Sequence, residues 1–278
     1  MLFFGATIGN MKTRFVLIET SHAGNVGSVA RAMKVMGFDD LVLVSPRWPD
    51  VLTRTEAIER ASGATDVLQR ARIVTTLEDA LGGMTHLCAT AMTPRDFGPP
   101  TSSPRAHFEH LLQGKDQGLE SVSRGMPEGV AFLFGCERYG MKNEDVYRCH
   151  VALSIPTHPD YGSLNLAAAV QLIAYDWRQA LDAYSVEAGQ MGQMAAASRS
   201  SQAKPPVRQL ADAVQVAGML AHWEQALVQI GFLDPAAPKK LMPRLTQLFN
   251  RAQLAPEEIH ILRGIAKSML ESTPHERK

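Results

Sequence analysis

Three short polar segments of the chain combine glycines with side chains that can hold a hydroxyl, a phosphate or a cofactor. They span 24–31, 135–140 and 162–165, and their functional side chains are Asn25, Arg31, Glu137, Ser163 and Asn165. Glycines allow tight turns and close backbone approach to a ligand, and amide, guanidinium and carboxylate groups make directed hydrogen bonds. A single turn of this kind is equally typical of a strand-to-helix connection with a surface arginine. Three in one domain exceed what packing requires, so we expect a binding site there.

Several familiar kinds of site are excluded by the same sequence. No G-x-G-x-x-G follows the first expected strand, and segment 135–142 misplaces the lysine of a P-loop and lacks its Ser or Thr. No G-x-S-x-G nucleophile turn occurs either. The three cysteines have no C-x-x-C spacing, and His107 with His110 has no neighbouring ligand pattern. We therefore expect neither a disulfide framework nor a metal site.

The elements that must position these segments follow from the apolar runs of the sequence. Runs rich in Val, Ile, Leu and Phe predict buried strands at 15–19, 41–45, 73–76, 86–91, 130–134 and 151–155. Helical stretches between them lie at 26–36, 77–81, 104–112, 143–149 and 164–183. This alternation is typical of an α/β domain with a mostly parallel sheet, which binds ligands beyond the carboxyl ends of its strands.

Composition divides the chain into three parts. Residues 13–184 carry the α/β pattern, and 14 of the 22 residues in 185–206 are Ala, Gly, Ser or Gln, which predicts a flexible linker. Residues 207–278 repeat apolar residues at helical spacing in three pieces, with Gly231 and Pro256 as stop and start signals. The first ten residues are expected to be an extension, neither a secretory segment nor a membrane span.

Charge gives no global sign of a nucleic-acid partner, because 28 Lys and Arg residues balance 28 Asp and Glu residues. Any RNA would then be bound through a local patch. Residues 207–278 hold nine basic and seven acidic residues, so the small positive surplus lies in the tail.

Taken together, the three segments resemble the ordered motifs of the SpoU branch of the SPOUT RNA methyltransferases. The opening segment 18–22, the linker and the helical tail make the chain most similar to the TrmJ type within that branch. The resemblance implies a trefoil-knotted α/β methyltransferase domain, a small all-helical C-terminal domain, S-adenosyl-L-methionine as cofactor and a homodimer.

Site residues follow from this resemblance position by position. The residues that it implies for cofactor binding are Thr90, Ala91, Met92, Gly135, Ile155, Gly162, Ser163 and Leu164. The residues that it implies for catalysis are Arg31, Ser163, Arg95, Asn25 and Glu137. Two departures from the TrmJ pattern occur: one arginine is missing from segment 89–95, and Gly162 stands where a serine is common.

The resemblance implies 2′-O-methylation of a cytidine or uridine ribose, at nucleotide 32, in the tRNA anticodon loop. Partners would be tRNA and a second copy of the chain, with no membrane, in the cytoplasm. Two alternatives are a SpoU-type enzyme acting on ribosomal RNA and a non-catalytic RNA-binding module. Because a guanidinium stays protonated, we expect Arg31 to act as an electrostatic clamp rather than as a general base.

Overall fold

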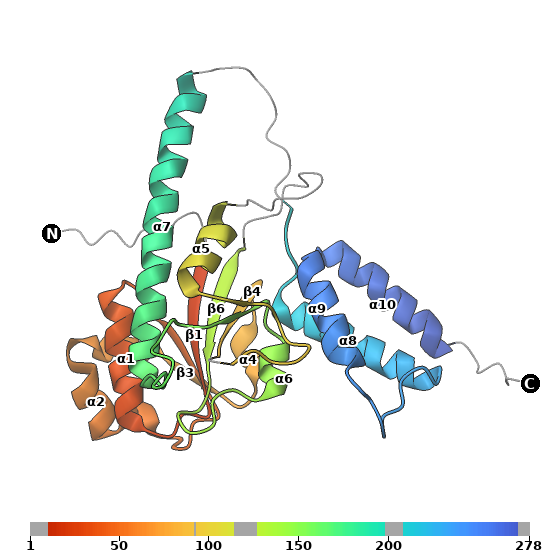
Figure 1. Cartoon of the computed structure of the whole chain (residues 1–278), viewed down its shortest axis with the longest axis horizontal. Helices are drawn as coiled ribbons and strands as arrows, with labels where there is room; N and C mark the ends of the chain where they lie inside the picture. The colour runs from red at the N-terminus through yellow and green to blue at the C-terminus, as the bar shows by residue number, and fades with distance from the viewer. Residues whose placement is uncertain (1–10, 92, 114–126, 198–207, 272–278) are drawn as a thin grey trace, which may run out of the picture.

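The computed structural model describes residues 11–91, 93–113, 127–197 and 208–271 (Figure 1). Its central sheet has seven strands in the order β3-β2-β1-β6-β4-β7-β5, and every pair of neighbours is parallel. The strands are β1 Lys12–Ile18, β2 Asp40–Val44, β3 Arg72–Val74, β4 His86–Thr90, β5 Thr101–Ser102, β6 Gly129–Phe134 and β7 Val151–Leu153. All six expected strands are confirmed, and the two-residue β5 is added at one edge.

One face of the sheet carries most of the helices. They are α1 Ala23–Val35, α2 Thr55–Ala61, α3 Thr65–Arg70, α5 Pro104–Gln113 and α7 Leu166–Ala197, with 3-10 turns at Val51–Thr53 and Ser62–Ala64. Their shared core includes Phe132, Phe108 and Trp177, whose rings contact one another, and Phe15, whose ring contacts that of Phe132; all four are fully buried. The sequence did not predict α2 and α3, because these short helices lack a long apolar repeat.

The opposite face is covered by two short helices and by the tail. The helices are α4 Leu77–Leu81 and α6 Asn143–Tyr147, and the apolar cluster beneath them includes Val16, Leu133 and Val146. Ala213, the first residue of the tail's first helix, packs against the same cluster. The tail therefore completes this face of the sheet domain.

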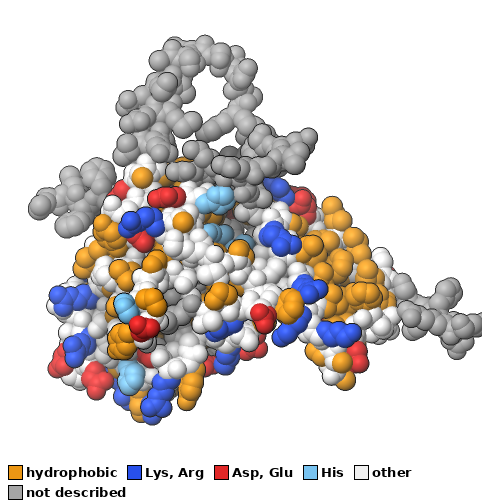
Figure 2. Space-filling view, in the orientation of Figure 1, with side chains coloured by type: hydrophobic (Ala, Val, Ile, Leu, Met, Phe, Trp, Pro, Cys, Tyr) orange, Lys and Arg blue, Asp and Glu red, His pale blue; other side chains and the backbone are white. Residues whose placement is uncertain are grey.

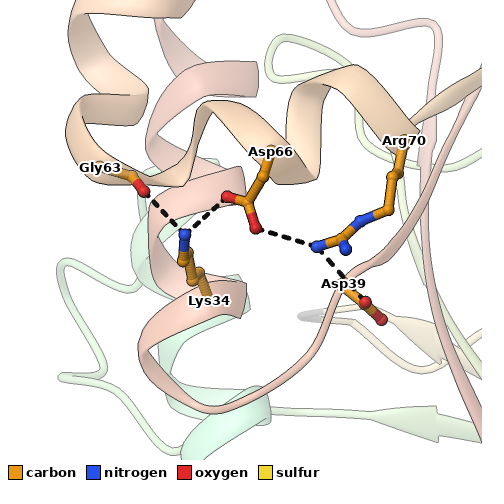
Figure 3. A network of polar contacts seen from close by, with 5 residues as sticks. All are labelled: Lys34, Asp39, Gly63, Asp66 and Arg70. Carbon is orange, nitrogen blue, oxygen red and sulfur yellow. Dashed lines mark hydrogen bonds and ion pairs between the residues drawn. The ribbon is translucent and has the colours of Figure 1, made fainter.

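Helix α1, which carries Asn25 and Arg31, is fixed by close packing and by an ion-pair network. A Cβ on Gly27 would lie 2.0 Å from the carbonyl oxygen of Ala57, so only glycine allows α1 and α2 to approach this closely. Figure 3 shows the network that ties the end of α1 to α3. In it, the ammonium group of Lys34 donates to Asp66 and to Gly63, and Arg70 pairs with Asp66 and Asp39. The hydrogen bond from Lys34 lowers the pKa of Asp66.

Helix α7 is longer than the sequence indicated. The expected helix ended at 183 and a linker was expected from 185, but α7 continues to Ala197 and reaches past the sheet (Figure 1). The expectation of a flexible linker is therefore wrong for 185–197, because Ala, Gln, Glu and Met in this segment are good helix formers. The rest of that range, 198–206, lies outside the described residues.

The tail forms the expected bundle of three helices. These are α8 Ala213–Gln229, α9 Leu241–Ala252 and α10 Pro256–Glu271. Asp212 and Gln215 form a capping box at the start of α8, and Gly231 follows its end with a φ of 70°. Met219, Phe249 and Ile259 are buried between the three helices.

Within the described residues, no helix is both long and apolar enough to cross a membrane. The expected extension at 1–10 lies outside the described residues.

Candidate functional site

Glu137 joins segments that are far apart in the sequence. It lies just beyond β6, and its carboxylate accepts hydrogen bonds from the Thr20 hydroxyl at 3.0 Å and the Ser21 amide at 2.9 Å. It also accepts from the Ser21 hydroxyl at 2.8 Å and from the Asn25 side-chain amide at 2.9 Å. β1 and β6 are parallel neighbours, so the turns that follow their carboxyl ends meet at one edge of the sheet.

The third segment joins this network through Asn165. Its side-chain amide donates to Oδ1 of Asn25 at 3.1 Å, and its own Oδ1 accepts from the Ala167 amide at 2.9 Å, which caps the start of α7. The structure therefore brings all three polar segments together. Thr20 and Ser21 are network residues that the sequence analysis missed; their position directly after β1 is the signal that could have found them.

Asn25 lies in the first turn of α1 and does not cap that helix. The N-cap residue is His22, whose side chain makes no cap hydrogen bond, and the helix begins at Ala23. The Asn25 side chain instead contacts Glu137 and Asn165, so its amide is used to join two loops. Ser28 is not the cap either; its hydroxyl donates to the carbonyl of Gly24 within α1.

The electrostatics of Glu137 follow from these contacts. Burial alone would raise the pKa of its carboxyl group, but the hydrogen bonds from Asn25 and Ser21 outweigh burial and lower the pKa to about 2. Glu137 is therefore ionised at neutral pH and acts only as an acceptor. That geometry suits a residue that fixes the loops.

The loop that presents Glu137 closes tightly on itself. The Gly140 amide donates to the carbonyl of Cys136 at 2.8 Å, and a Cβ on Gly135 would lie 2.2 Å from the Gly140 carbonyl carbon. Only glycine fits at position 135 with this geometry. Gly140 has a φ of 68°, which also favours glycine.

Three other residues expected to act in catalysis lie outside this network. Arg31 is exposed on α1, less than two turns beyond Asn25, and within the described residues it makes no hydrogen bond or ion pair. Ser163 is exposed before α7 and likewise has no partner among the described residues. Arg95 lies in loop 91–100, and its buried Nε has no hydrogen-bond partner in the described structure. These three residues are therefore free to contact a substrate.

The expected cofactor residues follow three neighbouring strands. β4 pairs with both β6 and β7, so Thr90, Gly135 and Ile155 come just at or beyond carboxyl ends that share one edge of the sheet. The hydroxyl oxygen of Thr90 is buried and has no hydrogen-bond partner within the described residues. A buried, unpaired hydroxyl beside open backbone turns fits a polar ligand.

The other residues expected to bind cofactor differ in their contacts and exposure. The Ala91 amide donates to the carbonyl of Leu153 at 3.0 Å, which fixes the backbone after β4. Gly162 is half-buried, and Ser163 and Leu164 are exposed directly before α7. Met92 lies outside the described residues.

A histidine cluster occupies the other end of β4, and the sequence analysis did not find it. The Nε2 atoms of His86 and His107 are 3.0 Å apart, and the Cys88 thiol lies close to both. His107 had been paired with His110 in the sequence, whereas the structure pairs it with His86 of the sheet. Burial lowers the pKa of His107 to about 4 and raises the pKa of Cys88. The ring of His150 lies tilted against that of His86, and burial lowers the pKa of His150 to about 4 as well.

Comparison with known proteins identifies the class. The SpoU rRNA Methylase family matches residues 12–175, and the C-terminal domain of tRNA methyltransferase TrmJ matches residues 214–278. The chain belongs to the SpoU methylase family, and its sheet domain has the trefoil-knotted α/β fold of that family. S-adenosyl-L-methionine is the methyl donor of these enzymes.

Individual relatives resemble the chain along nearly its whole length. The tRNA (cytidine/uridine/adenosine-2′-O-)-methyltransferase TrmJ of Pseudomonas aeruginosa is 39% identical, over 91% of this chain and 92% of that protein. The tRNA (cytidine/uridine-2′-O-)-methyltransferase TrmJ of Cronobacter sakazakii is 40% identical, over 95% and 98%. The crystal structure of TrmJ from Z. mobilis superposes with a TM-score of 0.71 at 28% identity, covering 92% of this chain and 98% of that one.

Proposed function

We propose that this protein transfers a methyl group from S-adenosyl-L-methionine to the 2′-hydroxyl of a cytidine or uridine in the tRNA anticodon loop, at nucleotide 32. The observation that carries the proposal is the network centred on Glu137, which assembles three segments beside the unpaired hydroxyl of Thr90. The tail supports tRNA as the substrate, because it matches the C-terminal domain of a tRNA methyltransferase.

The cofactor would bind along the edge formed by the ends of β4, β6 and β7. Thr90 offers its free hydroxyl there, and the backbone of Ala91, Gly135 and Ile155 offers amides and carbonyls. Segment 162–164 would cover it from the solvent side. When bound there, the cofactor supplies an electrophilic methyl group on a sulfonium.

The chain's own residues must then orient a poor nucleophile. The ribose 2′-oxygen would gain the methyl group as the sulfonium leaves as a neutral thioether, and the hydroxyl proton would pass to solvent water. Arg31 has a free, permanently protonated guanidinium, so it would stabilise the developing negative charge on that oxygen and hold a neighbouring phosphate. Ser163 would orient the ribose, and Arg95 would bind a phosphate.

Asn25 and Glu137 would position other parts of the site without contacting the reacting atoms. The carboxylate of Glu137, with a pKa of about 2, is too weak a base to remove a hydroxyl proton at neutral pH. It would hold the β1 and β6 turns so that Arg31 and the cofactor edge keep one relative geometry. Asn25 would extend that support to the start of α7.

We further propose a homodimer and a division of labour along the chain. Arg31 and Ser163 are exposed, and a second copy of the chain would complete the active site around them, as the family resemblance implies. Residues 13–184 would carry the chemistry, and 207–278 would contribute affinity for tRNA. The protein would act in the cytoplasm, with the part of 185–206 beyond α7 joining the two units.

The alternatives have less support. The only support for a ribosomal RNA substrate is the name of the SpoU rRNA Methylase family. Residues 214–278, in contrast, match a domain of a tRNA methyltransferase. A non-catalytic RNA-binding module would not need Arg31 kept free beside an assembled cofactor edge.

The direct test is methyl transfer in vitro. The purified full-length chain is incubated with labelled cofactor and either a tRNA transcript or ribosomal RNA, and the modified nucleoside is identified by mass spectrometry. We expect 2′-O-methylcytidine or 2′-O-methyluridine at nucleotide 32 of tRNA. Methylation of ribosomal RNA alone would favour the first alternative, and no transfer to either would favour the second.

A further inference from the structure

The helical tail contacts the loop that carries Arg95. The guanidinium carbon of Arg244, on α9, lies 4.6 Å from the centre of the Phe97 ring, which is the distance of a cation–π contact. Phe97 is 43% exposed and has a φ of 63°, a conformation that a bulky residue adopts only when its surroundings hold it. A contact between α9 and Phe97 is one such constraint.

Loop 91–100 is anchored by backbone hydrogen bonds at its two ends. The Ala91 amide donates to Leu153 at 3.0 Å, and the Ala152 amide donates to Pro100 at 2.9 Å, so both ends are fixed to β7. Between these anchors, the described residues of the loop make no hydrogen bond or ion pair to any other element. The cation–π contact between Arg244 and Phe97 therefore restrains the middle of the loop from the side of α9.

Arg95 depends directly on the conformation of that middle section. The Gly98 amide donates to the carbonyl of Arg95 at 2.9 Å, so both residues and Phe97 belong to one turn. A Cβ on Gly98 would lie 3.0 Å from the Cβ of Arg95, which shows how closely the turn is packed. Any force that holds Phe97 therefore also sets the direction of the Arg95 side chain.

Helix α9 is in turn fixed on the sheet domain. The buried amide of Gln247 donates to the carbonyls of Tyr147 and Cys149 at 2.9 and 3.3 Å. The buried amide of Asn250 donates to Arg148 and Cys149, at 3.2 Å each. These bonds occupy carbonyls at the end of α6 that would otherwise lack partners, and they fix α9 one turn beyond Arg244. Figure 2 shows basic side chains gathered along this border between the sheet domain and the tail.

We propose that Arg244 is a positioning residue for substrate binding: through Phe97 it holds loop 91–100 in the conformation that presents Arg95 to the RNA. This inference rests on the proposed function in one respect, namely that Arg95 contacts the substrate. It assigns the tail a second task besides adding affinity, because docking of α9 then sets the geometry of a loop in the methyltransferase domain.

The test is hydrogen exchange of the full-length chain, read at the Gly98 amide, which is hydrogen-bonded to Arg95 in the middle of loop 91–100. In R244A and in F97A we expect severalfold faster exchange in this loop, whereas F97Y, which keeps the ring, remains close to wild type. R251A is the matched control, because Arg251 lies exposed on the same helix and makes no hydrogen bond, ion pair or cation–π contact within the described residues. Unchanged exchange in R244A would overturn the proposal.

Kinetics separate positioning from direct contact of Arg244 with RNA. If Arg244 acts through Phe97, R244A and F97A each raise the KM for tRNA with little change in kcat, and the double variant is no worse than either single one. If the effects multiply, and only R244A reduces the salt dependence of binding, Arg244 binds phosphate itself and the proposal is wrong. A wild-type chain that does not methylate tRNA would refute the proposed function, and the exchange result would still decide whether α9 holds the loop.

Discussion

Asn25 and Glu137 lie 112 residues apart in the sequence, yet their side chains are joined by a 2.9 Å hydrogen bond. This bond connects the first turn of α1 to the loop after β6, and Asn165 extends it to the start of α7. The site is therefore a junction of three strand-to-helix connections, held by one carboxylate.

Replacing that carboxylate tests the junction. In E137Q, an amide NH2 faces donors on Ser21 and Asn25, so we expect a loss of about 1–2 kcal/mol of unfolding free energy. Cofactor binding should weaken as well, because the loops lose their relative geometry. Urea unfolding and calorimetry measure the two effects, and E59Q, at an exposed position on α2, is the matched control.

Lowering the pH should reduce the difference in unfolding free energy between the wild type and E137Q. The folded-state pKa of about 2 lies below the ordinary value of 4.5, so the unfolded chain takes up a proton first as the pH falls. The stabilisation by Glu137 is then present above pH 4.5 and decreases between pH 4.5 and 2. A difference between the two proteins that stays constant over this window would show that the carboxylate charge is not what matters.

Removing the Thr90 hydroxyl should have different effects on stability and on cofactor affinity. T90V removes a buried hydroxyl that has no partner among the described residues, so the protein without cofactor should be equally stable or slightly more stable. Its affinity for S-adenosyl-L-methionine should fall roughly 2- to 10-fold, which corresponds to one hydrogen bond. Calorimetry and thermal unfolding are the measurements, with exposed T101V as control; unchanged affinity would exclude the Thr90 hydroxyl from the cofactor site.

Arg31 and Ser163 should be needed for transfer and not for folding. Both are exposed and have no partner in the described structure, so R31A and S163A should unfold like wild type. We expect both to abolish single-turnover methyl transfer at saturating cofactor. R31K should also be severely impaired, because an ammonium cannot reproduce a planar two-donor fork. R70A, which removes a surface ion pair, is the control, and near-normal rates in R31K would mean that charge alone suffices.

The histidine cluster on β4 should make stability depend on pH. His107 and His150 have folded-state pKa values of about 4, below the usual 6.5, because burial disfavours their charged forms. Protonation of the unfolded chain therefore lowers the unfolding free energy as the pH falls from 6.5 to 4, by roughly 3 kcal/mol for each group. H107Q should flatten this dependence and exposed H260Q should not; an equally steep curve in H107Q would contradict the assignment.

The sequence predicted the strands, most helices and the three polar segments, because apolar periodicity and glycine-bearing turns are local signals. It could not predict which side chains meet. The pairing of His86 with His107 depends on how α5 lies over β4, and the bond between Asn25 and Glu137 depends on the register of β1 and β6.

Two further features of the structure could not be predicted from local sequence patterns. Segment 185–197 looked like a linker because small residues dominate it, yet α7 continues through it, since alanine-rich composition suits a helix as well as a loop. Docking of the tail on α6 uses two amides, Gln247 and Asn250, whose partners are backbone carbonyls and leave no trace in the sequence.

Mapping of ribose methylation in tRNA tests the proposed function, using cells that lack this protein and are complemented with the wild-type chain or with R31A. We expect 2′-O-methylation at nucleotide 32 to be absent without the protein, to return with the wild-type chain and not to return with R31A at equal protein levels. Methylation at nucleotide 32 that persists without the protein, or that R31A restores, would contradict the proposed function.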